Sequence, residues 1–159
     1  MEQKHLSSWL KLILVGIAIC GLVVYALVVP MYGRSLQTSY PELSNRFWPW
    51  LLFIWTSGIP CYIVLYYAWR IATNIGNGQS FTNQIASLLK RISFLASLDA
   101  VFFFVGYVVL LFLNMSHPGV AIASLVIVFV GVAVAVISAA LSHLVNKAAL
   151  LQEQSDWTI

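Results

Sequence analysis

Four long apolar stretches dominate the sequence, and their length restricts its fold more than any other feature. They run over residues 9–29, 47–69, 92–113 and 120–145. A helix needs about 20 mostly apolar residues to cross the hydrocarbon core of a bilayer, whereas strands are usually much shorter. None of the four shows the polar stripe, repeating every 3.6 residues, that a helix on a soluble domain carries. The sequence therefore predicts an all-α membrane protein, a bundle of four transmembrane helices forming a single membrane domain over residues 1–159.

The first stretch has an alternative interpretation as a secretory signal, because Lys4 and Lys11 would form its basic flank. Its apolar core of about 18 residues is longer than the 7–15 residues of a usual signal. The segment Val28-Val29-Pro30 also lacks the small residues of a cleavage site. We therefore expect this stretch to remain as the first span.

The positions of the basic residues predict the orientation of the helices. Cytoplasmic loops of membrane proteins carry an excess of Lys and Arg. Six basic residues fall near the two chain ends and in the middle connection, namely Lys4, Lys11, Arg70, Lys90, Arg91 and Lys147. Only Arg34 and Arg46 fall on the other side, so we expect both termini to be cytoplasmic. Because the basic residues flank apolar stretches instead of clustering, the net charge of +3 does not indicate direct nucleic-acid binding.

The connection between the second and third spans predicts a turn followed by a short amphipathic helix. Glycines and asparagines over residues 74–78 favour the turn, and Ser80 or Thr82 can cap the helix. Its apolar positions recur every three or four residues, so we expect this face to lie on the membrane surface before the helix continues into the third span. The candidate surface for a partner or for lipid headgroups consists of Arg70, Phe81, Thr82, Lys90 and Arg91. The outer loop of residues 30–46 suits an interfacial cap as well as a binding surface.

Small residues in the fourth span predict where helices pack closely. Helices in lipid gain little from hydrophobicity, so small side chains that allow close approach favour their association. Gly131, Ala135, Ser138 and Ser142 fall on one face at spacings of four, three and four residues. This face is expected to pack inside the bundle, and a homodimer contact is the alternative.

Asp99 is the one acidic residue within the four apolar stretches. An ionised carboxylate inside a membrane is costly unless it faces the bundle and finds a partner, or takes up a proton. Counting from the inner end of each span places Tyr62 and Ser138 at nearly the same depth, with His143 shallower. These four residues form our candidate intramembrane polar site. It would serve either as a proton- or ligand-coupled group or as a polar contact that ties helices together.

The sequence gives no support for an enzyme, a metal or a cofactor. It contains no GxSxG, HExxH or phosphate-binding glycine loop, and no two carboxylates fall in one predicted site. His5, His117 and His143 do not share a depth, so a metal or haem ligand set is not expected. Cys20 and Cys61 lie in apolar stretches and are expected to be buried thiols. We therefore expect no catalytic residue, no metal site and no cofactor.

The middle connection carries a family resemblance. Residues 71–82 read IATNIGNGQSFT, and residues 88–92 read LLKRI. These segments resemble the YoaS-like family of bacterial four-helix membrane proteins, whose members show a Gly-x-Pro-Phe-Thr segment ahead of a helix. Gly78, Phe81 and Thr82 keep this spacing loosely, but Gln79-Ser80 lacks the proline. The resemblance implies a multi-pass protein of the bacterial inner membrane, and it implies a helix-turn-helix regulator in the cytoplasm as a partner. It carries over no catalytic residue.

Two functional hypotheses follow. The leading one is a non-enzymatic regulatory or sensing protein that holds a cytoplasmic partner through residues 70–91 or through its tails. The alternative is a small proton-coupled transporter, or an accessory subunit of one, in which Asp99 carries the proton. An enzyme ranks third.

Overall fold

The fold consists of long helices, and the computed structural model describes them over residues 2–39, 47–113 and 118–156. The first rod is made of α1 (Glu2–Val23), the π-helix η1 (Val24–Val28) and α2 (Val29–Ser39), which follow one another without a break. The other three are α3 (Phe47–Gly76), α4 (Asn83–Phe112) and α5 (Pro118–Asp156). The described parts of the chain contain no strand.

Each of these helices is long and apolar enough to cross a bilayer, which confirms the prediction of four spanning helices. The shortest has 30 residues, or about 45 Å at 1.5 Å per residue, against a hydrocarbon core of about 30 Å. Large apolar side chains cover their outer faces: Leu12 is 64 % exposed and Phe129 is 73 % exposed. In water such a surface would be strongly unfavourable, whereas lipid tails solvate it.

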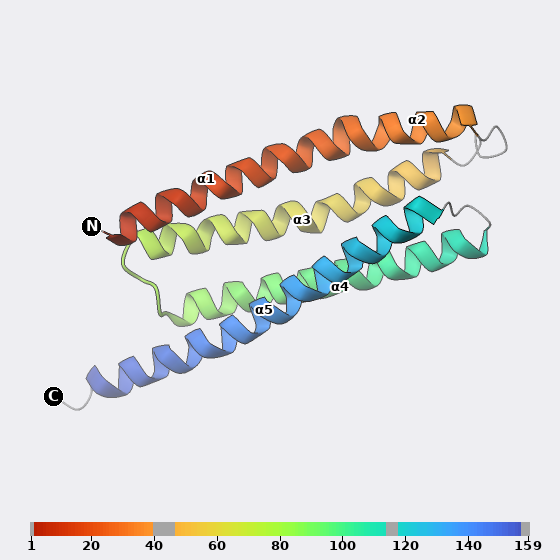
Figure 1. The fold of residues 1–159 in the computed structure, drawn as a ribbon. Coiled ribbons are helices and arrows are strands. Elements are labelled where there is room, and N and C mark those ends of the chain that lie inside the picture. The colour runs from red at the N-terminus through yellow and green to blue at the C-terminus, as the bar shows by residue number, and fades with distance from the viewer. Residues whose placement is uncertain (1, 40–46, 114–117, 157–159) are drawn as a thin grey trace.

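The helices form an open row in the order of the sequence. The first rod packs on α3, α3 packs on α4, and α4 packs on α5. In the described ranges α1 and α5 do not meet, so the bundle does not close into a ring (Figure 1). Both chain ends and the α3–α4 connection lie together at one end of the row, which we call the terminal end (Figure 1).

The most extensive interface joins α4 and α5, which cross each other in Figure 1. The small-residue face of α5 lies in it. A Cβ atom added at Gly131 would come within 3.2 Å of the Ala100 Cβ atom, and Ala135 and Ser138 are buried. The Ser142 hydroxyl donates a hydrogen bond of 2.7 Å to the carbonyl oxygen of Ala86. The structure thus places the face within the chain and not on its outside.

The first helix extends further than predicted. We expected a loop from residue 30 onward, but α2 carries the helix through Pro30 to Ser39. Proline interrupts a helix mainly because it lacks an N–H and crowds the preceding turn, and the wider turn of η1 lies directly before it. The rest of the predicted outer loop, residues 40–46 with Tyr40 and Arg46, lies outside the described residues, as does His117.

The α3–α4 connection closes with a helix-ending turn and a cap. Gly78 has a φ of +80°, and the N–H groups of Gly78 and Gln79 donate to the carbonyl oxygens of Ile75 and Asn74. This pair of bonds is a Schellman motif, and glycine suits its left-handed position. Thr82 then caps α4 by accepting a hydrogen bond of 3.4 Å from the N–H of Ile85, which confirms it as one of the two predicted caps.

The short amphipathic helix is not a separate element in the described residues. Its sequence forms the first turns of α4, as its expected continuation into the third span requires. Its apolar face does not point to a membrane surface, because Ile85 and Leu88 are buried against other helices. An apolar residue every three or four positions is compatible both with a helix on the membrane surface and with a helix packed against its neighbours. Here the apolar face packs against other helices.

A pair of glycine substitutions tests the α4–α5 contact. We expect Gly131→Leu to lower the free energy of unfolding by about 1–3 kcal/mol, because its side chain would meet the backbone and Cβ of Ala100. Gly16→Leu is the matched control, because nothing lies within 4 Å of a Cβ at Gly16. Thermal unfolding in detergent, followed by circular dichroism, measures both. Equal effects of the two variants would contradict this packing.

Candidate functional site

A break in the hydrogen bonding of the first helix positions the candidate site. In η1 the helix widens, and the N–H of Val29 donates to the carbonyl oxygen of Val24, five residues back. The next hydrogen bond with this five-residue spacing would run from the N–H of residue 30, which is Pro30, to the carbonyl oxygen of Tyr25. Proline has no N–H, so this carbonyl receives no backbone bond from Pro30. Single π-turns of this kind are frequent at functional sites.

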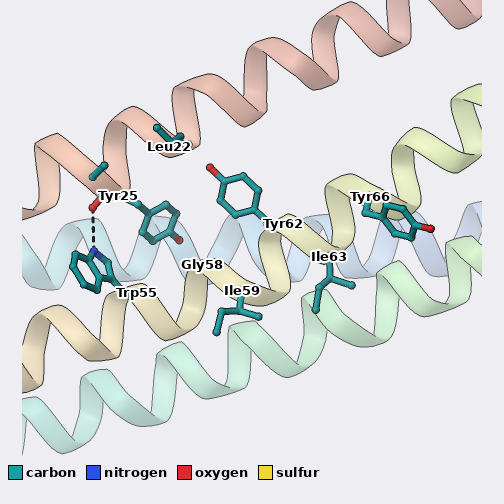
Figure 2. A pocket seen from close by; sticks show the side chains of 9 residues that line it. Leu22, Tyr25, Trp55, Gly58, Ile59, Tyr62, Ile63 and Tyr66 are labelled. Carbon is teal, nitrogen blue, oxygen red and sulfur yellow. Dashed lines mark hydrogen bonds between the residues drawn. The ribbon is translucent and has the colours of Figure 1, made fainter.

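The neighbouring helix α3 supplies the missing donor. The indole Nε1–H of Trp55 donates a hydrogen bond of 3.0 Å to the carbonyl oxygen of Tyr25 (Figure 2). The Tyr25 ring lies over Gly58, where an added Cβ would come within 3.3 Å of two ring carbons. The π-turn therefore fixes Tyr25 against α3 through both its backbone and its ring.

Asp99 lies near the middle of α4 and faces α3. The Cys61 Sγ atom lies 3.7 Å from the Asp99 Oδ2 atom, within reach of an S–H···O hydrogen bond. The other carboxylate oxygen, Oδ1, is buried and accepts no hydrogen bond from the residues that the structure describes. An ionised carboxylate without a donor at a buried oxygen is costly inside a membrane, so this carboxyl is suited to accept a further hydrogen bond.

Tyr25 joins this carboxyl to a small polar cluster. Its ring packs on Gly58 and brings its hydroxyl to the part of α3 that carries Ser57 and Cys61. We call these residues, Tyr25, Ser57, Cys61 and Asp99, the core cluster. It offers hydroxyl, thiol and carboxyl groups that exchange or hold a proton, and it draws on three helices. Across the described ranges, no three His, Cys, Asp or Glu side chains gather as metal ligands.

The structure does not bring the four predicted polar residues together. Tyr62 turns toward α1 (Figure 2). Its hydroxyl donates a hydrogen bond of 3.0 Å to the Ala18 carbonyl oxygen. Ser138 is buried on α5, between the contacts that Gly131 and Ser142 make with α4. His143 is exposed further along the same helix. The sequence grouped these residues by their depth in the membrane alone. In the structure they point in different directions around their helix axes, so their side chains lie apart.

Sequence reasoning missed Tyr25, Ser57 and Cys61. The prediction of buried thiols was wrong, because Cys20 and Cys61 are both exposed on the helix surfaces. The available signal was the position of Cys61, one residue from Tyr62 and therefore at almost the same depth as Asp99. For Tyr25 it was the spacing of five residues to Pro30.

An apolar groove of about 720 Å³ runs between the first rod and α3, beside the core cluster. Tyr25 and Gly58 line its middle, and Tyr62 and Tyr66 line it toward the terminal end (Figure 2). The groove is open, and Tyr66 is 58 % exposed. Since almost no polar atom faces it, lipid tails suit it as solvent.

Residues of the predicted partner or lipid surface lie at the terminal end but do not form one patch. Phe81 is 57 % exposed, Thr82 is occupied as the cap of α4, and Arg70 and Arg91 are exposed. Lys90 lines a crevice between α4 and α5. A second polar crevice lies where the α3–α4 connection meets the ends of α1 and α5.

Comparison with known proteins gives a family and a relative. The model of the family described as "Protein of unknown function (DUF2975)" matches residues 31–159. A protein of Bacillus subtilis (strain 168) described as "Uncharacterized membrane protein YoaS" is 26 % identical over 154 residues, which cover 94 % of each chain. No solved structure matches the chain. The relative confirms the resemblance that residues 71–92 carry, and its description agrees with the four apolar helices.

Replacing the indole of Trp55 tests how the π-turn is held. We expect Trp55→Phe to lower the free energy of unfolding by about 1–2 kcal/mol, because the Tyr25 carbonyl loses its donor where no water replaces it. Trp48→Phe is the control, since that side chain is 64 % exposed. Unfolding in detergent measures both variants. An equal loss in the two would show that the indole hydrogen bond contributes nothing.

Proposed function

The chain belongs to the family of membrane proteins of unknown function DUF2975, and we propose that it is a non-enzymatic regulatory or sensing protein that binds a soluble partner. In this proposal it lies in the bacterial inner membrane with both termini in the cytoplasm. The partner binds at the terminal end.

The charge distribution supports this orientation. Six of the eight basic residues lie at the terminal end or on the helix turns next to it, as the excess of Lys and Arg on the cytoplasmic side requires. Lys11 and Trp69 mark the boundary, because the Lys11 ammonium lies 5.4 Å from the centre of the Trp69 ring. Tryptophan and lysine commonly anchor helices at the level of the headgroups.

The observation that carries the proposal is a polar crevice at the terminal end, which we call the terminal crevice. Three segments far apart in the sequence form it: the start of α1, the α3–α4 connection and the end of α5. It has a volume of about 620 Å³ and is lined by Gln3, Gly78, Gln79, Ser80, Phe81, Thr82, Asn83, Ala149, Gln152 and Glu153. Binding there would report on the arrangement of the first and last helices, which do not otherwise meet in the described ranges.

The chemistry of the terminal crevice suits a protein. Phe81 is 57 % exposed and offers an aromatic anchor, and neutral amide and hydroxyl side chains surround it. Protein interfaces commonly have an apolar centre and a polar rim, with aromatic residues prominent among the residues that dominate affinity. Glu153 is the one charged side chain among the lining residues, which disfavours direct binding of nucleic acid. The family resemblance suggests a helix-turn-helix regulator as this partner, which we retain as part of the proposal.

Photocrosslinking in bacterial cells tests this function. A photoreactive amino acid placed at Gln79 and, separately, at Gln152 is expected to capture the same soluble protein, because both side chains line the terminal crevice. Phe129, 73 % exposed on the apolar surface of α5, is the control position and should not capture it. Mass spectrometry identifies the product. If both crevice positions recover the chain alone, the partner hypothesis fails.

A specific observation also favours the alternative, a proton-coupled transporter or accessory subunit. Asp99 has a buried carboxylate oxygen without a donor among the described residues, and its other carboxylate oxygen lies 3.7 Å from the Cys61 thiol of α3. Asp99→Asn separates the two functions. A regulator should keep its crosslinked partner in this variant, whereas a proton-coupled carrier should lose flux completely.

A further inference from the structure

The crevice that Lys90 lines lies between α4 and α5, on the face of α5 that carries His143. It has a volume of about 480 Å³, and we call it the α4–α5 crevice. From α4, Asn83, Ser87, Lys90 and Ser93 line it at helical spacing. From α5, His143 and Asn146 line the opposite wall.

The floor of the α4–α5 crevice is held together by a direct bond between the helices. The Ser142 hydroxyl donates to the Ala86 carbonyl oxygen at 2.7 Å, and the small side chains of Ala86 and Ala139 complete the lining. This floor belongs to the most extensive helix interface among the described residues. The two walls are therefore held in place by the packing of α4 on α5. The crevice is therefore a built feature of the helix pair.

The charges of the α4–α5 crevice favour an anion. Lys90 is its one formally charged side chain, and no Asp or Glu is among the lining residues. The asparagine and histidine side chains add hydrogen-bond donors. Asn83 is the first residue of α4, so the positive end of the helix dipole lies at this wall.

The depth of the α4–α5 crevice narrows the chemistry further. Its α4 wall, residues 83–93, ends where the apolar stretch of residues 92–113 begins. On α5, Asn146 follows directly after the stretch of residues 120–145. The crevice thus spans the boundary between apolar and polar chain, the level at which lipid phosphates lie in a bilayer. Basic pockets between helices at this level recognise anionic headgroups.

We propose that the α4–α5 crevice binds the phosphate group of an anionic lipid headgroup, with Lys90 as the charge partner and His143 and Asn146 as donors. The site goes beyond the proposed partner-binding function and does not rest on it. Asn83 lines both this crevice and the terminal crevice, so a bound headgroup would contact a wall of the partner site.

Lipid retention by the full chain tests the site. The protein, purified in detergent, is titrated with phosphatidylglycerol and separately with phosphatidylcholine, and native mass spectrometry counts bound lipid. Wild type should bind phosphatidylglycerol more tightly than phosphatidylcholine. Lys90→Gln should weaken phosphatidylglycerol binding about fivefold, because it removes the one charged side chain that lines the crevice and with it the ion pair to the phosphate. Asn146→Ala should also weaken binding, because it removes a hydrogen-bond donor from the opposite wall.

Arg91→Gln is the matched control, because it removes the same charge from the next residue of α4, which does not line the crevice. It should change the affinity by less than about twofold, because a charge outside the crevice makes no ion pair with the bound phosphate. Equal losses in Lys90→Gln and Arg91→Gln would overturn the site in favour of general charge attraction, and so would an unchanged affinity in both. Displacement of phosphatidylglycerol by glycerol phosphate at equal concentration would overturn the lipid as the source of the phosphate. Capture of a soluble protein at the terminal crevice is a separate readout, so either proposal can fail alone.

Discussion

A peptide carbonyl in hydrocarbon has no water to bond, and this constraint governs the structure. It requires each apolar stretch to form a continuous helix, because only a helix bonds its backbone groups within one segment. In the first rod one carbonyl lacks its helical partner, because Pro30 has no N–H to donate to the carbonyl oxygen of Tyr25. The indole of Trp55 on α3 supplies the donor at 3.0 Å, so a local defect becomes a contact between helices.

That contact organises the polar centre of the protein. With its carbonyl held by Trp55 and its ring on Gly58, Tyr25 is fixed within reach of Ser57 and Cys61. The Cys61 thiol in turn faces Asp99 on α4. Three helices thus share one small cluster, while α5 is joined to α4 by small residues and by the Ser142 hydrogen bond. In the described ranges α1 and α5 do not pack on each other, so the row of helices stays open.

The sequence predicted what depends on length and composition, and it failed where rotation about a helix axis decides. Four spans, the Thr82 cap and the depth of Asp99 relative to α3 all follow from counting along the chain. Counting placed Tyr62 beside Asp99, but a shift of one residue turns a side chain by about 100°, and Cys61 takes that place. The helix beyond Pro30 was missed because proline usually ends a helix, whereas here the widened turn of η1 precedes Pro30 and the helix continues. An open row of helices was also unpredictable, since apolar faces that meet protein and faces that meet lipid have the same composition.

The arrangement of the four rods is the claim on which the candidate sites and both proposals depend, and a topology assay measures it directly. Paired reporters, one active only in the cytoplasm and one only outside it, are inserted after Ser39, after Gly78 and at the carboxyl end. The structure and the charge distribution predict that Gly78 and the carboxyl end report the cytoplasm, and that Ser39 reports the opposite compartment. If Ser39 reports the same compartment as Gly78, α3 does not cross the membrane, and this account is wrong.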